Sequence, residues 1–168
     1  HRIQSKENSE FVPLISYFYP LDSVHQWNRI YGKKGFYQYQ CVIPKKPDGS
    51  NNLRKLLQSI SDAKTGSFLA ILKLFGPRDE PYLAFASEGY TLALDFPNRT
   101  GTEALFKKLD EIVLQSGGRL YLTKDARMSR TMFEEGYSQL GLFKAEKKRI
   151  DPENRYTSIQ AERLGLVH

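Results

Sequence analysis

The sequence predicts an α+β fold in which a ferredoxin-like antiparallel sheet carries its helices on one face. Strand and helix patterns follow in the order strand, helix, strand, strand, helix, strand, which is the split β-α-β arrangement. Each predicted helix is apolar on one side only, so it can cover one face of a sheet. The 168 residues suffice for one domain with a real core, and they contain no run of about 18 apolar residues that could span a membrane.

The elements up to the first strand follow from capping and alternation. Residues 16–22, SYFYPLD, have the character of an extended segment, and Asp22 can cap a short helix over residues 23–31. Gly32 then provides a common C-terminal stop. Residues 36–44, FYQYQCVIP, alternate in polarity and end at a proline, which predicts a strand.

The rest of the sheet follows from the same two periodicities. Residues 52–64 place leucines at helical spacing, and residues 67–75, SFLAILKLF, predict the second strand. Residues 82–97 are expected to form two extended arms around a Glu-Gly bend. A helix over residues 102–118 ends in glycines, and residues 119–125 predict the last strand.

The two faces of this sheet differ in polarity, because successive side chains of a strand point to opposite sides. One apolar set is expected to pack under the helices: Phe68, Ala70, Leu72, Leu74, Leu92, Leu94, Phe96, Leu120 and Leu122. The opposite parity gathers mostly polar side chains from four strands: Gln38, Gln40, Lys73, Thr91, Ala93, Asp95, Tyr121 and Thr123. This face predicts either the wall of a binding site or a wetted surface. Within its own strand, the neighbours of Lys73 on this face are apolar. A Lys73–Asp95 ion pair would be the purely structural explanation of a lysine among them.

The end of the predicted last strand is crowded with charge. In GGRLYLTKDAR, Tyr121 is followed at once by Lys124, Asp125 and Arg127. Ends of strands often carry ligand-contacting residues, because the loops beyond them can vary freely. The stretch is therefore either the rim of a site or a solvated strand end.

Composition limits the partners and the chemistry. The net charge of +6 favours an anionic partner: a phosphorylated substrate, an acidic membrane surface, nucleic acid, or a second domain with a phosphate-rich cofactor. The single cysteine, Cys41, excludes an internal disulfide and a cysteine-rich metal site. Three scattered histidines do not indicate a metal cluster, so we expect no metal.

Two other functions fit parts of the pattern. A sheet with aromatics and positive charge also describes an RNA-recognition module, and KGFYQYQC, residues 34–41, begins like its signature. The match then fails, because Tyr37 stands where a small residue belongs and the stretch precedes the first helix of the sheet. A protein-docking domain would use the basic helix FKAEKKRI, residues 143–150, as its contact surface.

Four stretches together resemble the C-terminal half of FAD-linked oxidoreductases of the vanillyl-alcohol-oxidase superfamily. They are YFYPLD with WNRIYGKKGFYQYQCVIP, FLAILKLFG, GYTLALDFP and GGRLYLTKDAR, in order and with similar spacing over about residues 17–166. Within the superfamily the resemblance is nearest to the decaprenylphosphoryl-ribose oxidase family and more distant to aldonolactone oxidases. Each motif alone is weak, but four in sequence are fairly specific.

The resemblance implies a domain organisation. Residues 1–10 would be a linker or a cut end, and residues 11–168 a C-terminal substrate or cap domain, with a sheet core at about 36–127 and a helical extension at 128–168. The chain begins at His1, and we expect an N-terminal FAD-binding domain to precede it in a longer protein. Without that domain, we expect the chain to be inactive.

The resemblance also implies an activity and partners. Such enzymes oxidise a sugar or sugar-lactone hydroxyl to a ketone by hydride transfer to FAD. The implied partners are the enzyme's own FAD-binding domain, a sugar or polyprenyl-phosphate sugar, and a partner reductase, with no nucleic acid. The implied location is the cytoplasm or a peripheral position at the inner membrane.

Matched by motif, Gln38, Gln40 and Lys73 correspond to substrate-pocket residues. Tyr121 and Lys124 correspond to the tyrosine and lysine that lie against flavin and substrate, and Lys124 is the catalytic candidate, as a base or as a stabilising cation. The shared sheet face adds three residues to the expected substrate site: Thr91, Ala93 and Asp95. Ala93 departs from the family pattern, which has a pocket cysteine there, and this puts the identity of the substrate in doubt.

Overall fold

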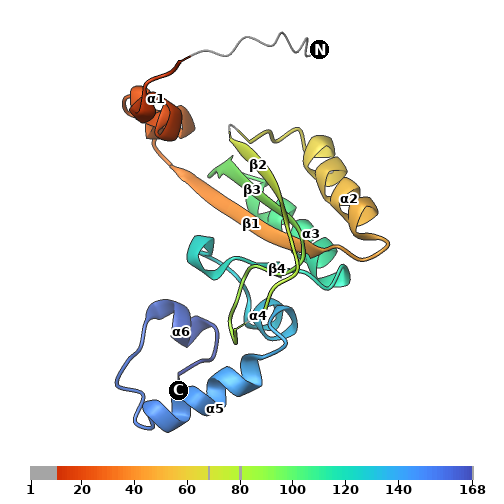
Figure 1. Cartoon of the computed structure of the whole chain (residues 1–168), viewed down its shortest axis with the longest axis vertical. Coiled ribbons are helices and arrows are strands. Elements are labelled where there is room, and N and C mark those ends of the chain that lie inside the picture. Colours follow the sequence, from red (N-terminus) through yellow and green to blue (C-terminus); the bar gives the residue numbers. More distant parts are fainter. Residues whose placement is uncertain (1–10, 68, 80, 168) are drawn as a thin grey trace.

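A four-stranded antiparallel sheet forms the centre of the computed structural model, which describes residues 11–67, 69–79 and 81–167 (Figure 1). Its strands are β1 (Phe36–Pro44), β2 (Ala70–Phe75), β3 (Gly89–Pro97) and β4 (Arg119–Leu120), in the spatial order β2-β3-β1-β4. β3 thus lies between β1 and β2, and β1 lies between β3 and β4, so two β-α-β units interleave. The predicted α+β class is confirmed.

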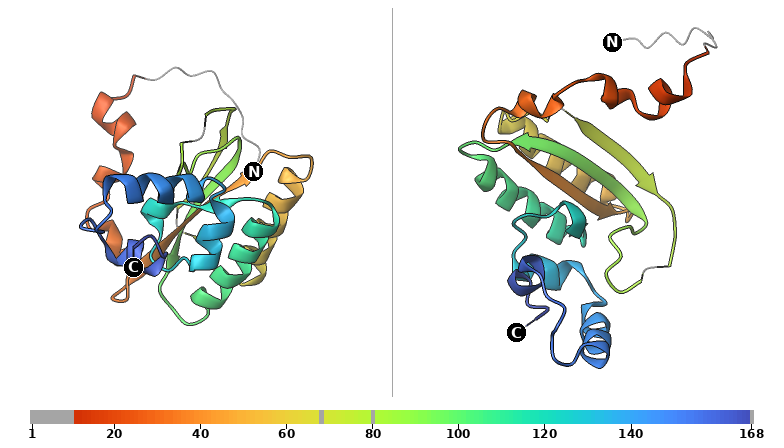
Figure 2. Two further views of the ribbon diagram at one scale, coloured as in Figure 1. Left: turned by 90° about the horizontal axis from the view of Figure 1, so that it is seen from below. Right: turned by 90° about the vertical axis from the view of Figure 1, so that its left-hand side faces the viewer.

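Two helices, α2 (Gly49–Asp62) and α3 (Thr102–Gln115), cover one face of the sheet (Figure 2). Their apolar sides pack on the inward parity of β1 and β3, as predicted. The buried core includes Tyr39, Cys41, Ile43, Leu56, Leu92, Leu94, Phe96, Phe106, Leu109 and Val113. Full burial of each large apolar side chain contributes roughly 1.5–3 kcal/mol before the cost of conformational entropy. The helices therefore fix which face stays open.

The edge strand β2 departs from the prediction. Ala70, Leu72 and Leu74 were expected under the helices, yet all three residues are exposed, Leu72 by 54% and Leu74 by 58%. β2 is the outermost strand, and no contact between it and either helix is among the main packing contacts of the described residues. Phe68, the first member of the same apolar set, lies outside the described residues.

The N-terminal arm is helical rather than extended, so the predicted extended segment at 16–22 is wrong. α1 (Leu14–Phe18) is followed by two short 3-10 helices, η1 (Pro20–Ser23) and η2 (Trp27–Tyr31). Prolines 13 and 20 flank α1, and Asp22 lies inside η1 instead of capping a helix. Gly32 ends η2 with a φ of 74°, which confirms the predicted stop and favours glycine.

The loop between β2 and β3 is longer than predicted. Residues 82–88 form no strand, so the first of the two expected arms is wrong and β3 begins at Gly89. A Cβ atom at Gly89 would lie 2.2 Å from the Ile43 carbonyl oxygen, so only glycine fits where β3 meets β1.

The C-terminal region forms three helices: α4 (Arg130–Gly136), α5 (Leu140–Ile150) and α6 (Ile159–Arg163). Met132 and Phe133 bury against the core, and Tyr137 Oη donates to the Leu120 carbonyl at 2.6 Å, which ties the extension to β4. Side chains of Ser129 and Ser158 cap α4 and α6. None of the described helices is long and apolar enough to cross a membrane.

Candidate functional site

The open face of the sheet carries a pocket of about 150 Å³. Strand register builds it: Gln38 pairs with Asp95 and Gln40 with Ala93 across β1 and β3, while Lys73 pairs with Thr91 across β2 and β3. Directly paired residues of antiparallel strands share a face. Seven predicted site residues accordingly line one pocket: Gln38, Gln40, Lys73, Thr91, Ala93, Asp95 and Lys124.

A second, smaller hollow of about 20 Å³ shares lining residues of β1 with the first. Gln38, Gln40 and Lys124 line both hollows, and Tyr121 lines the second one only. The Tyr121 ring stacks on Phe85 with 4.5 Å between ring centroids. Thr123, expected on the same face, lines neither hollow. The polar residues therefore form a continuous surface, with Tyr121 on the side of β4.

The last strand is shorter than predicted, and this decides where its charges point. β4 ends at Leu120 instead of residue 125, and η3 (Leu122–Lys124) follows. The Tyr121 amide still donates to the Gln40 carbonyl at 2.9 Å before the chain turns. The turn brings Lys124 to the rim of both hollows.

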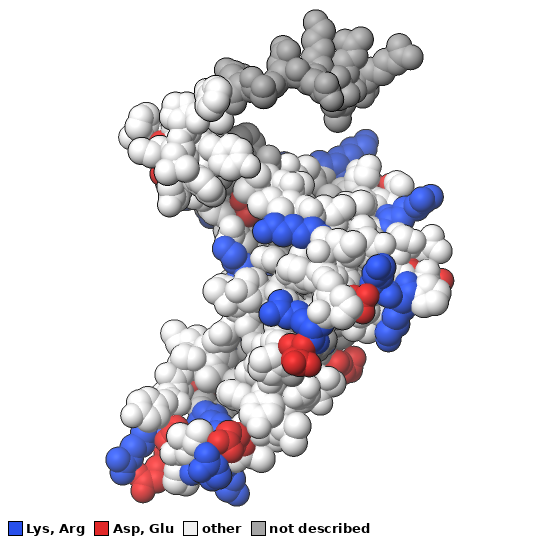
Figure 3. Space-filling view, viewed as in Figure 1, with Lys and Arg blue, Asp and Glu red and all other residues white. Residues whose placement is uncertain are grey.

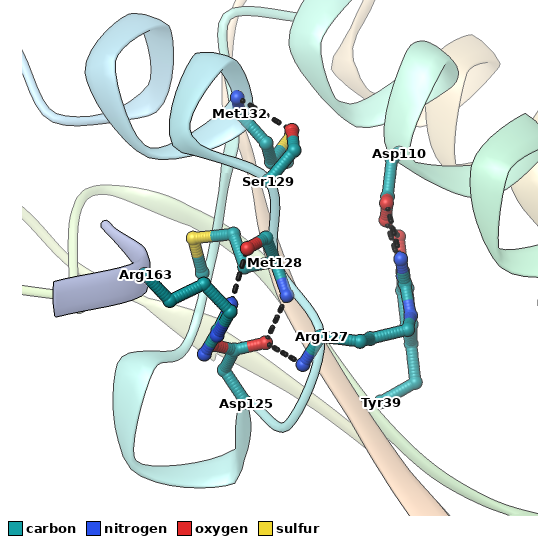
Figure 4. A network of polar contacts seen from close by, with 8 residues as sticks. All are labelled: Tyr39, Asp110, Asp125, Arg127, Met128, Ser129, Met132 and Arg163. Atoms are coloured by element: carbon teal, nitrogen blue, oxygen red, sulfur yellow. Dashed lines mark hydrogen bonds and ion pairs between the residues drawn. The ribbon is translucent and has the colours of Figure 1, made fainter. Parts of the chain in front are cut away.

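Asp125 is a structural residue. Its side chain is 3% exposed, and its Oδ1 accepts from the amides of Arg127 and Met128 at 2.8 and 2.6 Å (Figure 4). Its Oδ2 accepts from Arg163 of α6 at 2.6 Å. Burial alone would raise the pKa of Asp125, but these hydrogen bonds and the charge of Arg163 outweigh it and hold the pKa below its usual value.

Arg127 is likewise committed within the domain. It makes two hydrogen bonds to Asp110 of α3, at 2.8 and 2.9 Å, and its guanidinium lies 4.6 Å from the centroid of the Phe106 ring. The hydroxyl of Tyr39 donates to the same carboxylate at 3.0 Å. Of the three charges in TKDAR, two are thus explained by folding, and Lys124 remains as the ligand-facing candidate.

The two pocket lysines have no described counter-ion. Within residues 11–67, 69–79 and 81–167, no carboxylate lies within 4.0 Å of Nζ of Lys73 or Lys124. The Lys73–Asp95 pair, which would have explained Lys73 structurally, is therefore wrong. Both ammonium groups can serve an anionic or electron-rich ligand.

The two pocket glutamines are oriented by partners on β3. Gln38 Nε2 donates to Asp95 Oδ1 at 3.2 Å, and Gln40 Nε2 donates to Thr91 Oγ1 at 3.3 Å. An amide that gives its NH2 group to a neighbour turns its Oε1 the other way. Both glutamines therefore offer carbonyl oxygens, which accept hydrogen bonds from hydroxyl groups.

Tyr31 contacts a pocket residue although the sequence did not indicate it. Its hydroxyl donates to Asp95 Oδ2 at 3.2 Å, across 64 residues of chain. Burial, the Asp95 charge and this hydrogen bond raise the pKa of Tyr31 to about 12. No local pattern in WNRIYG predicts so distant a contact.

The face in view in Figure 3 carries Lys and Arg side chains at separate points rather than in one patch. Around α5, Lys147 pairs with Asp151, Arg149 with Glu146, and Lys144 with Glu134. The net positive charge is therefore not gathered on this helix as a free basic surface. No group of three or more His, Cys, Asp or Glu side chains in the described part of the chain could hold a metal ion.

The only cysteine should be unreactive in the native protein. Cys41 is fully buried, and burial raises the pKa of its thiol to about 12, so almost no thiolate is present at neutral pH. We expect a thiol reagent such as dithionitrobenzoate to label the wild-type chain only after unfolding. Ala93→Cys, which places a thiol in the pocket, should be labelled once in the native state. Rapid labelling of the native wild-type chain would contradict this burial.

The comparisons with known proteins agree with the motifs. No family model matches the chain. The chain is 34% identical over 154 residues to "Decaprenylphosphoryl-beta-D-ribose oxidase" of Mycolicibacterium smegmatis, and 33% identical over 147 residues to an uncharacterised protein of Streptomyces coelicolor. The matches cover 92% and 87% of this chain, but only 33% and 39% of those proteins. The resemblance is thus confirmed: the chain is similar over most of its length to an oxidase of which it spans about a third.

Proposed function

We propose that the chain is the substrate-covering domain of an FAD-dependent oxidoreductase that oxidises a sugar or sugar-lactone hydroxyl to a ketone. The observation that carries this proposal is the pocket on the open face, whose lining includes all seven positions assigned to the substrate or to catalysis by motif and face. The similarity to an oxidase supports the reaction class. The location of the whole enzyme, in the cytoplasm or peripherally at a membrane, follows only from the resemblance.

The open face is suited to a flavin supplied by another domain. The helices of the sheet lie on the opposite side, and Tyr121 and Lys124 stand together at the hollow beside β4. In this proposal Tyr121 lies along the cofactor, and the Lys124 ammonium faces its electron-rich edge. FAD, when bound, would accept the hydride. The isolated chain should bind FAD weakly or not at all and show no turnover.

The pocket chemistry favours a polyol as substrate. Gln38 and Gln40 occupy alternate positions of β1, so their side chains leave the same face about 7 Å apart. Their carbonyl oxygens can each accept from a hydroxyl group. Thr91 of β3 and Lys73 of β2 lie on the same face as the glutamines and are paired with each other. The ammonium group of Lys73 could neutralise a phosphoryl group of a polyprenyl-phosphate sugar.

Lys124 has two open roles in the proposed reaction. As a cation it would hold the reacting hydroxyl and stabilise the negative charge that develops beside it. As a neutral amine it would accept the hydroxyl proton at Nζ. Either role requires that Lys124 be unpaired in the domain, which agrees with its lack of a described counter-ion.

The two alternatives have less support. An RNA-binding sheet stacks bases on aromatic side chains of its open face, but Tyr39 is buried on the helix side and Tyr37 packs against Phe106. A docking surface on α5 would need free basic side chains, whereas Lys147 and Arg149 are paired with neighbouring carboxylates.

The test is substrate-dependent bleaching of the flavin in the intact polypeptide that contains this chain. Under anaerobic conditions, we expect a member of a panel of sugars, sugar lactones and polyprenyl-phosphate sugars to bleach the oxidised flavin. Gln40→Leu should raise the half-saturating concentration about tenfold, because one hydrogen-bond acceptor is lost. Gln58→Leu, on the exposed side of α2, is the matched control and should change nothing.

Two results would contradict the proposed function. One is an intact polypeptide that binds no flavin, or whose flavin no member of the panel bleaches. The other is stoichiometric FAD and turnover on the isolated 168-residue chain, which would refute the assignment of the flavin to another domain.

A further inference from the structure

Tyr31 connects the N-terminal arm to the pocket. It ends η2, and its ring stacks on Phe36 of β1 with 4.3 Å between centroids and 25° between planes. From there its hydroxyl reaches Asp95 on β3. Tyr31 does not line the pocket itself, and among the described contacts it is the bond to Asp95 that links it to the pocket lining.

Both carboxylate oxygens of Asp95 accept hydrogen bonds from protein side chains. The residue is only 6% exposed, its Oδ2 accepts from Tyr31 and its Oδ1 accepts from Gln38, each at 3.2 Å. Its backbone N–H donates to Ser67 Oγ at 2.7 Å. A buried carboxylate needs such donors, because an uncompensated charge is costly away from water. With both oxygens used, Asp95 supports the pocket wall more than it contacts a ligand.

We propose that Tyr31 is a positioning residue, which holds the Asp95 carboxylate so that Gln38 turns its carbonyl oxygen toward the ligand. This inference rests on the proposed function for the identity of the ligand as a polyol. The chain of contacts runs from Tyr31 Oη through Asp95 to Gln38 Nε2. It makes position 38 an acceptor and so selects a hydroxyl donor at that point of the substrate.

A purely structural role for Tyr31 predicts something different. The stacking on Phe36 and the edge contact with Trp27 depend on the ring and not on the hydroxyl. Tyr31→Phe keeps both ring contacts and removes the hydroxyl that donates to Asp95. The Asp95 carboxylate then loses one of its two side-chain donors, and Gln38 is free to present either end of its amide.

The direct readout is the side-chain amide signal of Gln38 in a 1H–15N spectrum of the full 168-residue chain. We expect Tyr31→Phe to shift the Gln38 pair while the Gln40 pair, which is bound to Thr91, stays in place. Tyr17→Phe, which removes an exposed hydroxyl of the same arm, is the control and should move neither pair. Asp95→Asn should also shift the Gln38 pair, because it changes the acceptor to which Gln38 Nε2 donates.

An unshifted Gln38 pair in Tyr31→Phe would overturn the proposal, as would equal shifts of Gln38, Gln40 and the backbone signals of β1. In the intact enzyme, Tyr31→Phe should raise KM for the sugar that bleaches the flavin about three- to tenfold and leave kcat within about twofold. An unchanged KM would also refute it. If no sugar bleaches the wild-type flavin, the proposed function fails, while the Gln38 spectrum still decides the role of Tyr31.

Discussion

In the proposed flavoenzyme that contains this chain, Lys124→Met should slow reduction of the flavin by its substrate at least about 100-fold. Loss of one preorganised charge at developing negative charge typically costs 10²–10³ in rate, and loss of a general base costs 10²–10⁴. Methionine keeps the unbranched apolar stem, and Lys124 makes no described ion pair, so the fold should be unaffected. The measurement is single-turnover flavin absorbance after anaerobic mixing with saturating substrate.

Two companion variants complete this experiment. Lys107→Met, on the exposed side of α3, removes a charge far from the pocket and should leave the rate unchanged. Lys124→Arg separates the two roles, because guanidinium keeps the cation but cannot act as a base at neutral pH. Substantial activity in the arginine variant would favour charge stabilisation. A wild-type rate in Lys124→Met would remove this residue from the mechanism.

Alternation along single strands was enough to predict the candidate pocket. Gln38 and Gln40 on β1, and Thr91, Ala93 and Asp95 on β3, share a face because the period of a strand is two, whatever the rest of the chain does. The amphipathic helices then determine which face is covered. Lys73 could be added by the same parity argument once β2 was expected beside β3.

The contacts that distinguish one charge from another were beyond sequence reasoning. Lys124, Asp125 and Arg127 look alike as a crowded strand end, but Asp125 meets Arg163 of α6 and Arg127 meets Asp110 of α3. These partners are 38 and 17 residues away. Tyr31 was missed for the same reason, since its role depends on a residue 64 positions later.

Edges and ends of the fold were also hard to predict, because local pattern competes with tertiary context there. Leu72 and Leu74 carry a core pattern, yet the two helices sit over the centre of the sheet and leave β2 outside. β4 stops after two residues because the chain turns into η3, in which the amides of Lys124 and Asp125 donate to the carbonyls of Tyr121 and Leu122 instead of to a neighbouring strand. Neither outcome follows from propensity alone.

Asp125→Asn should destabilise the chain by about 3 kcal/mol at pH 7, because it leaves the guanidinium of Arg163 in a partly buried site without its counter-charge. Asparagine can still accept from the amides of the turn, so the loss of stability reports mainly the contact between the carboxylate and Arg163. Gln160 donates to the same carboxylate oxygen. The measurement is the free energy of unfolding by urea. Glu134→Gln, which removes one partner of an exposed pair with Arg130, is the matched control and should change little.

The stability gap between wild type and Asp125→Asn should also depend on pH in a defined direction. The folded-state pKa of Asp125 is lower than the unfolded value of about 3.9, so its stabilisation is complete above that value. It is lost as the pH falls through the folded-state pKa, where the native carboxylate takes up its proton. Unfolding free energies measured from pH 7 down to about pH 2 should therefore show the gap narrowing only at the acid end. A gap that stays constant over this range would mean that the ionised carboxylate of Asp125 does not hold α6 against the turn that carries Lys124.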